Sequence, residues 1–280
     1  MSPTLRTLSA RPLFPLLLLA AVLLPTPLLA QETIRIGGTG TGLGTMGLLA
    51  SAFQKKHREI KIRIMPSIGS SGAIKATAQG ALDIGLNGRP LKEEETRLGL
   101  VVTEYAKTPF VFAVRKDVPI QGLSSDELVR IYRGEMRTWP NGEWVRLVLR
   151  PRSDADTIIA RAISPEMSAA LDRALSREGM LMAATNQESN DMIDRTAGSI
   201  GFSTLTQIMT EKHPVKALAI NGVGPITTGG ANKHYPFMKT LSLLTKPGAP
   251  PAVQRFIDFV RSPEGAGILL NTGNIPVAAK

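Results

Sequence analysis

Two turns rich in glycine and hydroxyl side chains are the parts of this chain best suited to chemistry. The segments GGTGTGLGT, residues 37–45, and SIGSSGAIK, residues 67–75, each stand between a strand-like run and a helix-like run. A helix start has backbone N–H groups without partners and a partial positive charge, so a strand, a glycine turn and a helix together form a cradle for an anion. Two such cradles in one chain predict an oxyanion held from two sides.

The first turn also has the G-x-G-x-x-G spacing of a dinucleotide-binding loop, at Gly42, Gly44 and Gly47. The acid that would hold a ribose hydroxyl is missing, because the second strand, IKIRIMPS, ends without Asp or Glu. No Gly-Lys-Ser or Gly-Lys-Thr follows, as a nucleoside-triphosphate loop requires. A tight turn without a ligand is the structural alternative, and the three threonines of the turn favour ligand contact.

In the second turn, a pair of adjacent serines allows two roles. One of Ser70 and Ser71 is predicted to cap the helix that begins near Gly72. Because a cap needs only one hydroxyl, the other serine is free to contact a ligand, and its glycine neighbours suit a backbone nest for an anion.

The elements that must position these turns alternate along the chain. Strands are predicted at residues 33–38, 60–65, 81–86, 109–116, 145–150, 198–204 and 215–220. Helices are predicted at residues 48–57, from about Ser70, at residues 124–134 and from residue 251 onward, the last with a core-facing stripe of Val253, Phe256, Ile257 and Val260. Alternation of this kind indicates an α/β fold with parallel strands and crossover helices.

The N-terminus and the composition limit the class of protein. Arg6 and Arg11 followed by the apolar run 13–30 predict an export signal cleaved after Ala30, with an uncleaved anchor as the alternative because Leu28 is large for that position. The remaining 31 basic and 23 acidic residues give a charge of about +8, which favours anionic partners. Nucleic acid is disfavoured because the basic residues are scattered and aromatics make up 5%. With no cysteine, the fold depends on its core alone.

Taken together, several motifs resemble the periplasmic phosphate-binding proteins of ABC importers. They are the first glycine turn, GSSGAIKATAQGALDIG followed by GRP, IYRGEMRTW, GSIGF, and FVRSPEGAGILLNTGNIPV. The resemblance covers nearly all of the chain after the leader and implies a type II periplasmic-binding-protein fold. Two α/β lobes, each a mostly parallel sheet flanked by helices, would close on a ligand at the hinge. Lobe 1 is expected at residues 31–112 and 222–280 and lobe 2 at 113–221.

Carried over residue by residue, the resemblance implies contacts to the anion at the two turns and at a third helix start, RPRSDADT, residues 150–157. The expected ligand-binding residues are Thr41, Gly42, Leu43, Ser70, Ser71, Arg89, Arg152, Ser153, Asp154, Asp156 and Thr157. At this third element, a capping role for Ser153, Asp154 and Asp156 on the following helix is the structural alternative.

Two of these matches depart from the family pattern. Where the family has an aspartate that accepts the proton of phosphate, this chain has Gly88, followed by Arg89. In the third element, Asp154 and Asp156 replace the small residues of an Arg-x-Ser-Gly-Thr type sequence. Protonated phosphate is distinguished from sulfate by a buried acceptor, so the preferred oxyanion stays open. Asp154 or Asp156 could be that acceptor, or either could pair with Arg89 or Arg152.

Catalysis lacks support in the sequence. The three histidines, His57, His213 and His234, are far apart and form no metal-ligand cluster, and no serine nucleophile elbow is present. The sequence therefore predicts an exported, non-catalytic and monomeric binding protein without metal or cofactor, which passes an oxyanion, foremost phosphate, to a membrane permease. The alternatives are a sensory module, a binder of sulfate, molybdate or tungstate, and an exported nucleotide-dependent oxidoreductase.

Overall fold

The computed structural model describes residues 31–277. The expected export signal and its cleavage position after Ala30 lie outside the described residues. Within residues 31–277, no helix is both long enough and apolar enough to cross a bilayer.

One ten-stranded sheet runs through the described part of the chain. Its strands are β1 (Glu32–Gly38), β2 (Ile60–Ile64), β3 (Ile84–Asn87), β4 (Val101–Arg115), β6 (Arg146–Leu149), β7 (Leu181–Met182), β8 (Ser199–Thr204), β9 (Val215–Ala217), β13 (Met238–Thr245) and β14 (Ile275–Pro276). Two small two-stranded sheets pair β5 (Gly122–Leu123) with β10 (Ala219–Ile220) and β11 (Ile226–Thr227) with β12 (Gly230–Ala231).

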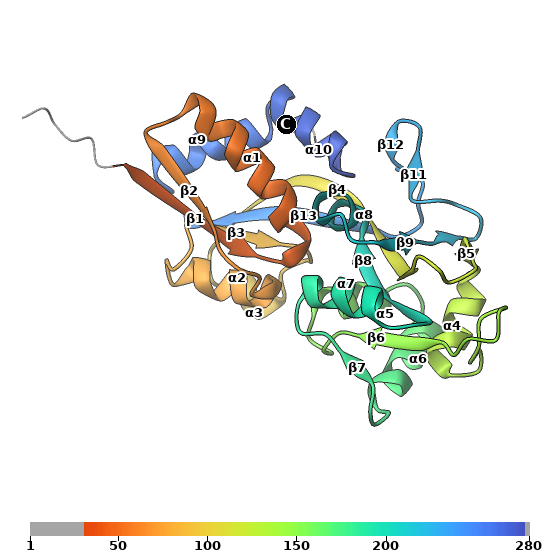
Figure 1. Cartoon of the computed structure of the whole chain (residues 1–280). Coiled ribbons are helices and arrows are strands. Elements are labelled where there is room, and N and C mark those ends of the chain that lie inside the picture. The colour runs from red at the N-terminus through yellow and green to blue at the C-terminus, as the bar shows by residue number, and fades with distance from the viewer. Residues whose placement is uncertain (1–30, 278–280) are drawn as a thin grey trace, which may run out of the picture. The chain divides into compact units, whose positions relative to one another are not determined.

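The helices lie on both sides of this sheet (Figure 1). They are α1 (Leu43–Lys56), α2 (Gly69–Ala78), α3 (Glu93–Thr96), α4 (Ser125–Arg133), α5 (Ala155–Arg161), α6 (Pro165–Leu175), α7 (Asn186–Arg195), α8 (Leu205–Glu211), α9 (Pro251–Val260) and α10 (Pro263–Asn271), with the short 3-10 turn η1 (Gly40–Gly42) before α1. The alternation of strands and helices predicted from the sequence is confirmed.

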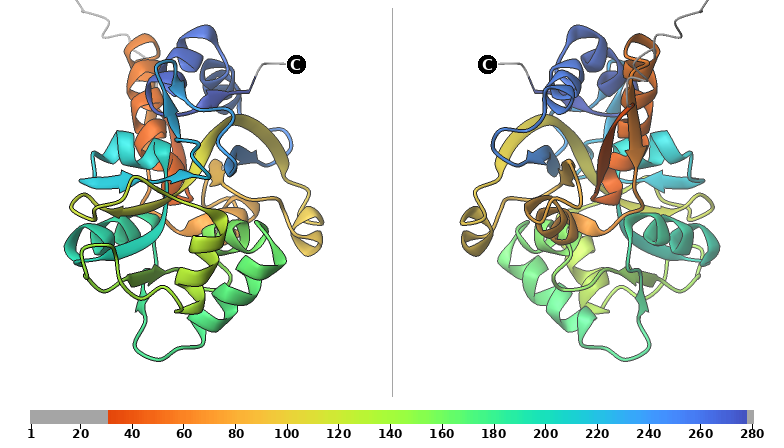
Figure 2. Two further views of the ribbon diagram at one scale, coloured as in Figure 1. Left: turned by 90° about the vertical axis from the view of Figure 1, so that its right-hand side faces the viewer. Right: turned by 90° about the vertical axis from the view of Figure 1, so that its left-hand side faces the viewer.

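The strand order β2-β1-β3-β13-β4-β8-β6-β7 places parallel pairs at both ends and antiparallel pairs in the middle. Strand β1 pairs in parallel with β2 and β3, and β6 pairs in parallel with β7 and β8. Between them, the 15-residue β4 pairs with β13 along its first part, Val101–Pro109, and with β8 along its second, Phe110–Val114. Figure 2 shows β4, the long yellow strand, passing between the two sets of elements. One strand therefore belongs to both halves of the sheet.

Each half of the sheet has its own hydrophobic core. The first core includes Ile34, Ile36, Phe53 and Phe256, and the second includes Phe110, Phe112, Tyr132, Phe202 and Tyr235. We propose that the two lobes divide along these cores. The chain then passes from lobe 1 to lobe 2 within β4, a few residues from the expected boundary at 112–113. It passes back to lobe 1 close to the start of β13 and not at residue 222, because Tyr235 still packs in the second core.

Most local predictions agree with the structure. The helix predicted at residues 124–134 is α4, and Ser124 caps it, with its Oγ accepting a hydrogen bond from the Glu127 N–H at 3.1 Å. The predicted serine cap at the second glycine turn is wrong. Helix α2 begins at Gly69, and its N-cap residue, Ile68, makes no side-chain capping bond. The strand predicted at 109–116 is the second half of β4, whose first half was missed because it lacks a continuous apolar run.

The stripe predicted on α9 is buried, and Phe256 is its centre. Phe256 is fully buried, and its ring packs edge-on against Phe53 with centroids 5.2 Å apart. Replacing Phe256 with alanine should lower the free energy of unfolding by about 3–5 kcal/mol because it leaves a cavity in the first core. Urea denaturation followed by circular dichroism measures this change. The exposed neighbour Arg255→Ala is the control and should change the stability by less than about 0.5 kcal/mol. Equal effects of the two substitutions would contradict this packing.

Candidate functional site

The ends of several strands meet where the two halves of the sheet adjoin. Strand β1 leads into the first glycine turn, and β3 leads into Gly88. Strand β6 leads to the start of α5, and the antiparallel β13 begins beside them. Because carboxyl ends of parallel strands collect loops and helix starts at one edge, this is where an α/β protein places a ligand.

A buried lysine, Lys239, connects these loops. Its side chain is fully buried, and its Nζ donates a hydrogen bond to Thr41 Oγ1 at 3.0 Å. The same Nζ forms an ion pair with Oδ1 of Asp156. Lys239 thereby joins the first glycine turn to the start of α5, two of the three elements expected to form the site.

Asp156 is held on both of its carboxylate oxygens. Asn186, the first residue of α7, donates its Nδ2–H to Asp156 Oδ2 at 2.6 Å, and Oδ1 receives Lys239. An unpaired charge in such a place would cost several kcal/mol, so the lysine, the carboxylate and the amide depend on one another.

Gly88 leaves the space that the lysine occupies. A Cβ atom added at Gly88 would lie 2.5 Å from Cε of Lys239 and 3.3 Å from its Nζ. The position at which the resemblance leads one to expect an aspartate is therefore filled by the stem of Lys239. In this arrangement the buried carboxylate of the site is Asp156 of α5, the helix that follows β6 in the second half of the sheet.

The two serines of the second glycine turn hold the segment after β3. Ser70 is buried, and its Oγ accepts a hydrogen bond from the Gly88 N–H at 3.0 Å. Ser71 is exposed, and its Oγ accepts from Arg89 Nη2 at 2.9 Å. Because Ser70 Oγ accepts this hydrogen bond, the hydroxyl hydrogen of Ser70 is still available to donate to another group.

Arg89 has a carboxylate partner inside the protein. Its buried guanidinium donates to both oxygens of Glu95, at 2.7 and 2.6 Å. The hydrogen bond from Arg89, together with a backbone bond from Lys92 and the charges of both residues, holds the pKa of the Glu95 carboxyl below its usual value despite the opposing effect of burial. The pairing of Arg89 with Asp154 or Asp156 that the sequence allowed is therefore wrong, since its carboxylate partner is Glu95.

The third predicted element is divided between the interior and the surface. Asp154 caps α5, accepting from the Asp156 N–H at 2.9 Å, and pairs with the buried Arg150 at 2.6 Å. Thr157 is buried, and its hydroxyl donates to the Arg150 carbonyl at 3.1 Å. Arg152 and Ser153 are exposed, and Arg152 pairs with Asp172. The capping alternative is thus correct for Asp154, whereas the structure does not bring Arg152 and Ser153 to the buried cluster.

The first turn keeps its expected place. Thr41 and Gly42 are buried in η1, and Leu43 begins α1. A Cβ atom at Gly42 would lie 3.0 Å from the Tyr105 hydroxyl, so a larger residue there would fit only tightly. The structure therefore brings Thr41, Gly88 and Asp156 together around Lys239, with Ser70 bonded to Gly88 and Gly42 next to Thr41 in the chain.

The comparison with protein-family models decides the family. Residues 26–264 match the model of the PBP superfamily domain. The chain belongs to the PBP superfamily. It is also 26% identical over 254 residues to the phosphate-binding protein PstS of Bacillus subtilis, covering 89% of this chain and 82% of that protein. The resemblance found in the sequence is confirmed.

Solved structures confirm the α/β fold of this PBP superfamily member. A putative phosphate ABC transporter substrate-binding protein with bound phosphate from Clostridium perfringens superposes with a TM-score of 0.76 at 23% identity, over 88% of this chain and all of that one. An ABC-type phosphate transport receptor from Vibrio cholerae gives a TM-score of 0.62 at 19% identity, over 86% and 99% of the two chains.

Two residues of the site were missed by sequence reasoning, Lys239 and Asn186. A signal for Lys239 exists, because it is a lone charge near the start of the apolar run MKTLSLLT. A charge at such a position needs a buried partner, but nothing in the sequence says that the partner is 83 residues away. Asn186 has no signal beyond its place in a polar helix start.

The lysine–carboxylate pair should be measurable as an energetic coupling. Lys239→Met leaves a buried carboxylate without its counter-charge and should cost about 3–5 kcal/mol of unfolding free energy. The double variant with Lys239→Met and Asp156→Asn should be destabilised less than the sum of the two single variants, by about 1–3 kcal/mol. A double-mutant cycle by urea denaturation gives this coupling.

The exposed pair Lys56–Glu264 provides a matched control for the cycle at Lys239 and Asp156. Its side chains are 60% and 43% exposed, so the cycle of Lys56→Met and Glu264→Gln should give a coupling of less than about 1 kcal/mol. Additive effects at Lys239 and Asp156 would mean that the buried pair does not form in solution.

Proposed function

We propose that this protein captures inorganic phosphate between its two lobes as an exported solute-binding protein. One observation carries the proposal: a buried lysine bonds to a threonine hydroxyl of one glycine turn and to a carboxylate of the opposite lobe, next to Gly88, which is bonded to Ser70 of the other turn. The names of the relatives support phosphate as the ligand, since they are phosphate-binding and phosphate-transport proteins.

The donors at this place suit a tetrahedral oxyanion. Lys239 uses two of its N–H groups on Thr41 and Asp156, which leaves a third for an anion oxygen. The hydroxyls of Thr41 and Ser70 add neutral donors from the two turns. Because Asp156 already offsets the lysine charge, most of the binding energy comes from hydrogen bonds to these preorganised groups.

Asp156 is the acceptor that separates phosphate from sulfate. At neutral pH phosphate still carries a proton, and this P–OH group donates a hydrogen bond to the carboxylate. Sulfate is fully ionised, and its oxygens meet the carboxylate without a hydrogen between them. We thus assign to Asp156, from the second lobe, the role expected of an aspartate at position 88.

The proposal includes delivery. Strands β4 and β13 cross between the lobes and form the hinge about which they open and close. The protein acts outside the cytoplasm after removal of the leader at Ala30, as a monomer, and passes phosphate to the permease of an ABC importer. It needs no cofactor and catalyses no reaction, and nucleic acid is not a partner.

Calorimetric titration of the purified protein with phosphate, sulfate, molybdate and tungstate tests this function. Phosphate should bind, and sulfate should bind far more weakly. Asp156→Asn should weaken phosphate binding by roughly 10- to 100-fold, because a charged hydrogen bond contributes about 1.5–3 kcal/mol. The same substitution should improve sulfate binding relative to phosphate.

Asp258→Asn is the control, because it removes the same charge from an exposed position on α9. It should leave both affinities unchanged. Failure of all four anions to bind the folded protein would refute the proposed function. Phosphate binding that is insensitive to Asp156→Asn would refute the role of Asp156 alone.

A further inference from the structure

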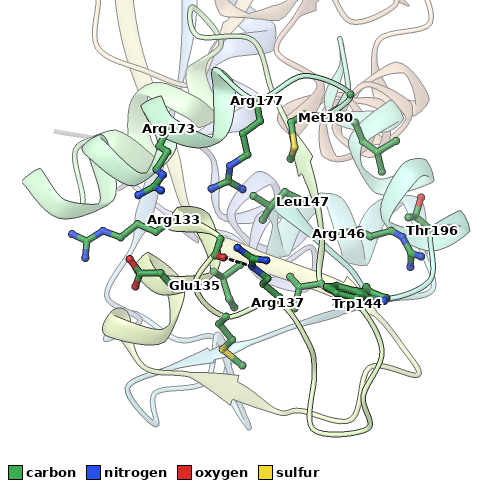
Figure 3. Close-up of a pocket in the computed structure, with 16 residues that line it drawn as sticks. Arg133, Glu135, Arg137, Trp144, Arg146, Leu147, Arg173, Arg177, Met180 and Thr196 are labelled. Carbon is green, nitrogen blue, oxygen red and sulfur yellow. Dashed lines mark hydrogen bonds between the residues drawn. The ribbon is translucent and has the colours of Figure 1, made fainter.

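A second concentration of positive charge lies away from Lys239. A groove of about 1170 Å³ is formed by the C-terminal end of α4, the end of α6 with the loop after it, and the start of β6. Its lining includes five arginines, which Figure 3 shows around the groove: Arg133, Arg137, Arg146, Arg173 and Arg177. One acidic residue, Glu135, lies among the lining residues.

In the described part of the chain, none of the five arginines forms an ion pair with a carboxylate, although Glu166 lies near enough to attract Arg133. Arg35, Arg89, Arg150 and Arg152, by contrast, each pair with an acid. Three of the five are instead fixed by backbone carbonyls: Arg137 by Gly134 at 2.9 Å, Arg146 by Ala197 at 2.7 Å and Arg177 by Tyr132 at 2.7 Å. Each of these guanidiniums is held in place with further N–H groups to offer.

The positive charges are close enough to disfavour one another. Burial, followed by the like charges of Arg173 and Arg137, lowers the pKa of the Arg177 guanidinium from its ordinary value. Arg177 also lies against Gly134, where an added Cβ would be 3.0 Å from its Nη2. Bonds to the carbonyls of Gly134 and Tyr132, at the end of α4, account for the positions of Arg137 and Arg177. In the described part of the chain, Arg133 and Arg173 make no such bond.

The groove has an aromatic wall. Trp144 lines it and is 60% exposed, which is unusual for so large an apolar side chain. The chain's other tryptophan, Trp139, is buried and donates its indole N–H to the Gly198 carbonyl at 2.9 Å. An exposed indole beside guanidinium groups suits a ligand with a planar ring as well as negative charge.

We propose that this groove is a second anion site, which binds a chain of linked phosphate groups, either free or as part of a nucleotide. Guanidinium forks match phosphate oxygens in pairs. Arg173, on α6, and Arg177, in the loop after it, lie on one side, and Arg137 and Arg146 lie on the other side (Figure 3). A chain of two or three phosphates offers oxygens to the arginines on both sides of the groove at once.

The position of this site separates it from the proposed phosphate site. Arg146 is the first residue of β6, and the segment that leads to Asp156 follows the last residue of the same strand. The two sites therefore lie at opposite ends of β6. The second does not depend on the first for its residues or its binding chemistry.

Intrinsic fluorescence gives a direct test, because Trp144 is the exposed one of two tryptophans. The purified protein is titrated with tripolyphosphate, ATP and adenosine at low salt, with saturating inorganic phosphate present to occupy the first site. Tripolyphosphate and ATP should bind, with affinities that fall as salt is raised, and adenosine should not. If ATP binds more tightly than tripolyphosphate, and calorimetry shows that Trp144→Leu removes this difference, the nucleotide ring contacts Trp144. Equal binding would assign the site to free phosphate chains.

Arg133→Glu with Arg173→Glu should weaken tripolyphosphate binding at least tenfold, measured by calorimetry. Lys61→Glu with Arg63→Glu, on the exposed side of β2, makes the same change in net charge and should alter the affinity less than twofold. No binding of tripolyphosphate or ATP to the parent protein, or an equal loss in both double variants, would overturn the proposal. Inorganic phosphate binding by the Arg133/Arg173 variant should be unchanged, so failure here is distinct from failure of the proposed function.

Discussion

The buried pair of Lys239 and Asp156 is the interaction on which the candidate site depends. An ammonium and a carboxylate taken out of water are tolerated only when each has a partner and its remaining hydrogen-bonding groups are used. Thr41 completes the lysine, and Asn186 completes the carboxylate. Gly88 supplies the space for the lysine stem. One electrostatic requirement thus explains residues from five segments that are far apart in the sequence.

The Lys239–Asp156 pair connects the two halves of the sheet. Thr41 follows β1 in the half of the sheet around the first core, and Asp156 lies at the start of α5 against the second core. The two cores share β4 and adjoin at β13, so a change in the angle between the lobes leaves each core packed. Under the proposed function, such a change would separate Lys239 from Asp156 or bring them together. The ion pair is then the contact that a bound anion shares.

Much of the fold could be predicted because its signals are local. The alternating strands and helices, the Ser124 cap and the α9 stripe depend on neighbours within a few residues. The site could be predicted only in part. The glycine turns have a local signature, whereas the partner of Lys239 is distant in sequence. Ser70, one of the two serines from which a cap was predicted, instead accepts from Gly88, 18 residues away. Arg89 pairs with Glu95 and not with Asp154 or Asp156, because those two carboxylates are taken by Arg150 and Lys239.

The two concentrations of positive charge differ in a way that suits different tasks. At Lys239 the charge is balanced by Asp156, so the net field is small and discrimination depends on where protons and lone pairs meet. In the groove beside Trp144, five guanidiniums face one acid, so the field is strong and acts over a distance of about a Debye length, ~8 Å at physiological salt. A strong field gathers anions but distinguishes them poorly, since it responds to charge more than to protonation. A balanced, buried site gathers them poorly but distinguishes them well. Selectivity for one oxyanion therefore requires the neutralised lysine of the inner site, and an arginine cluster like that of the groove could not replace it.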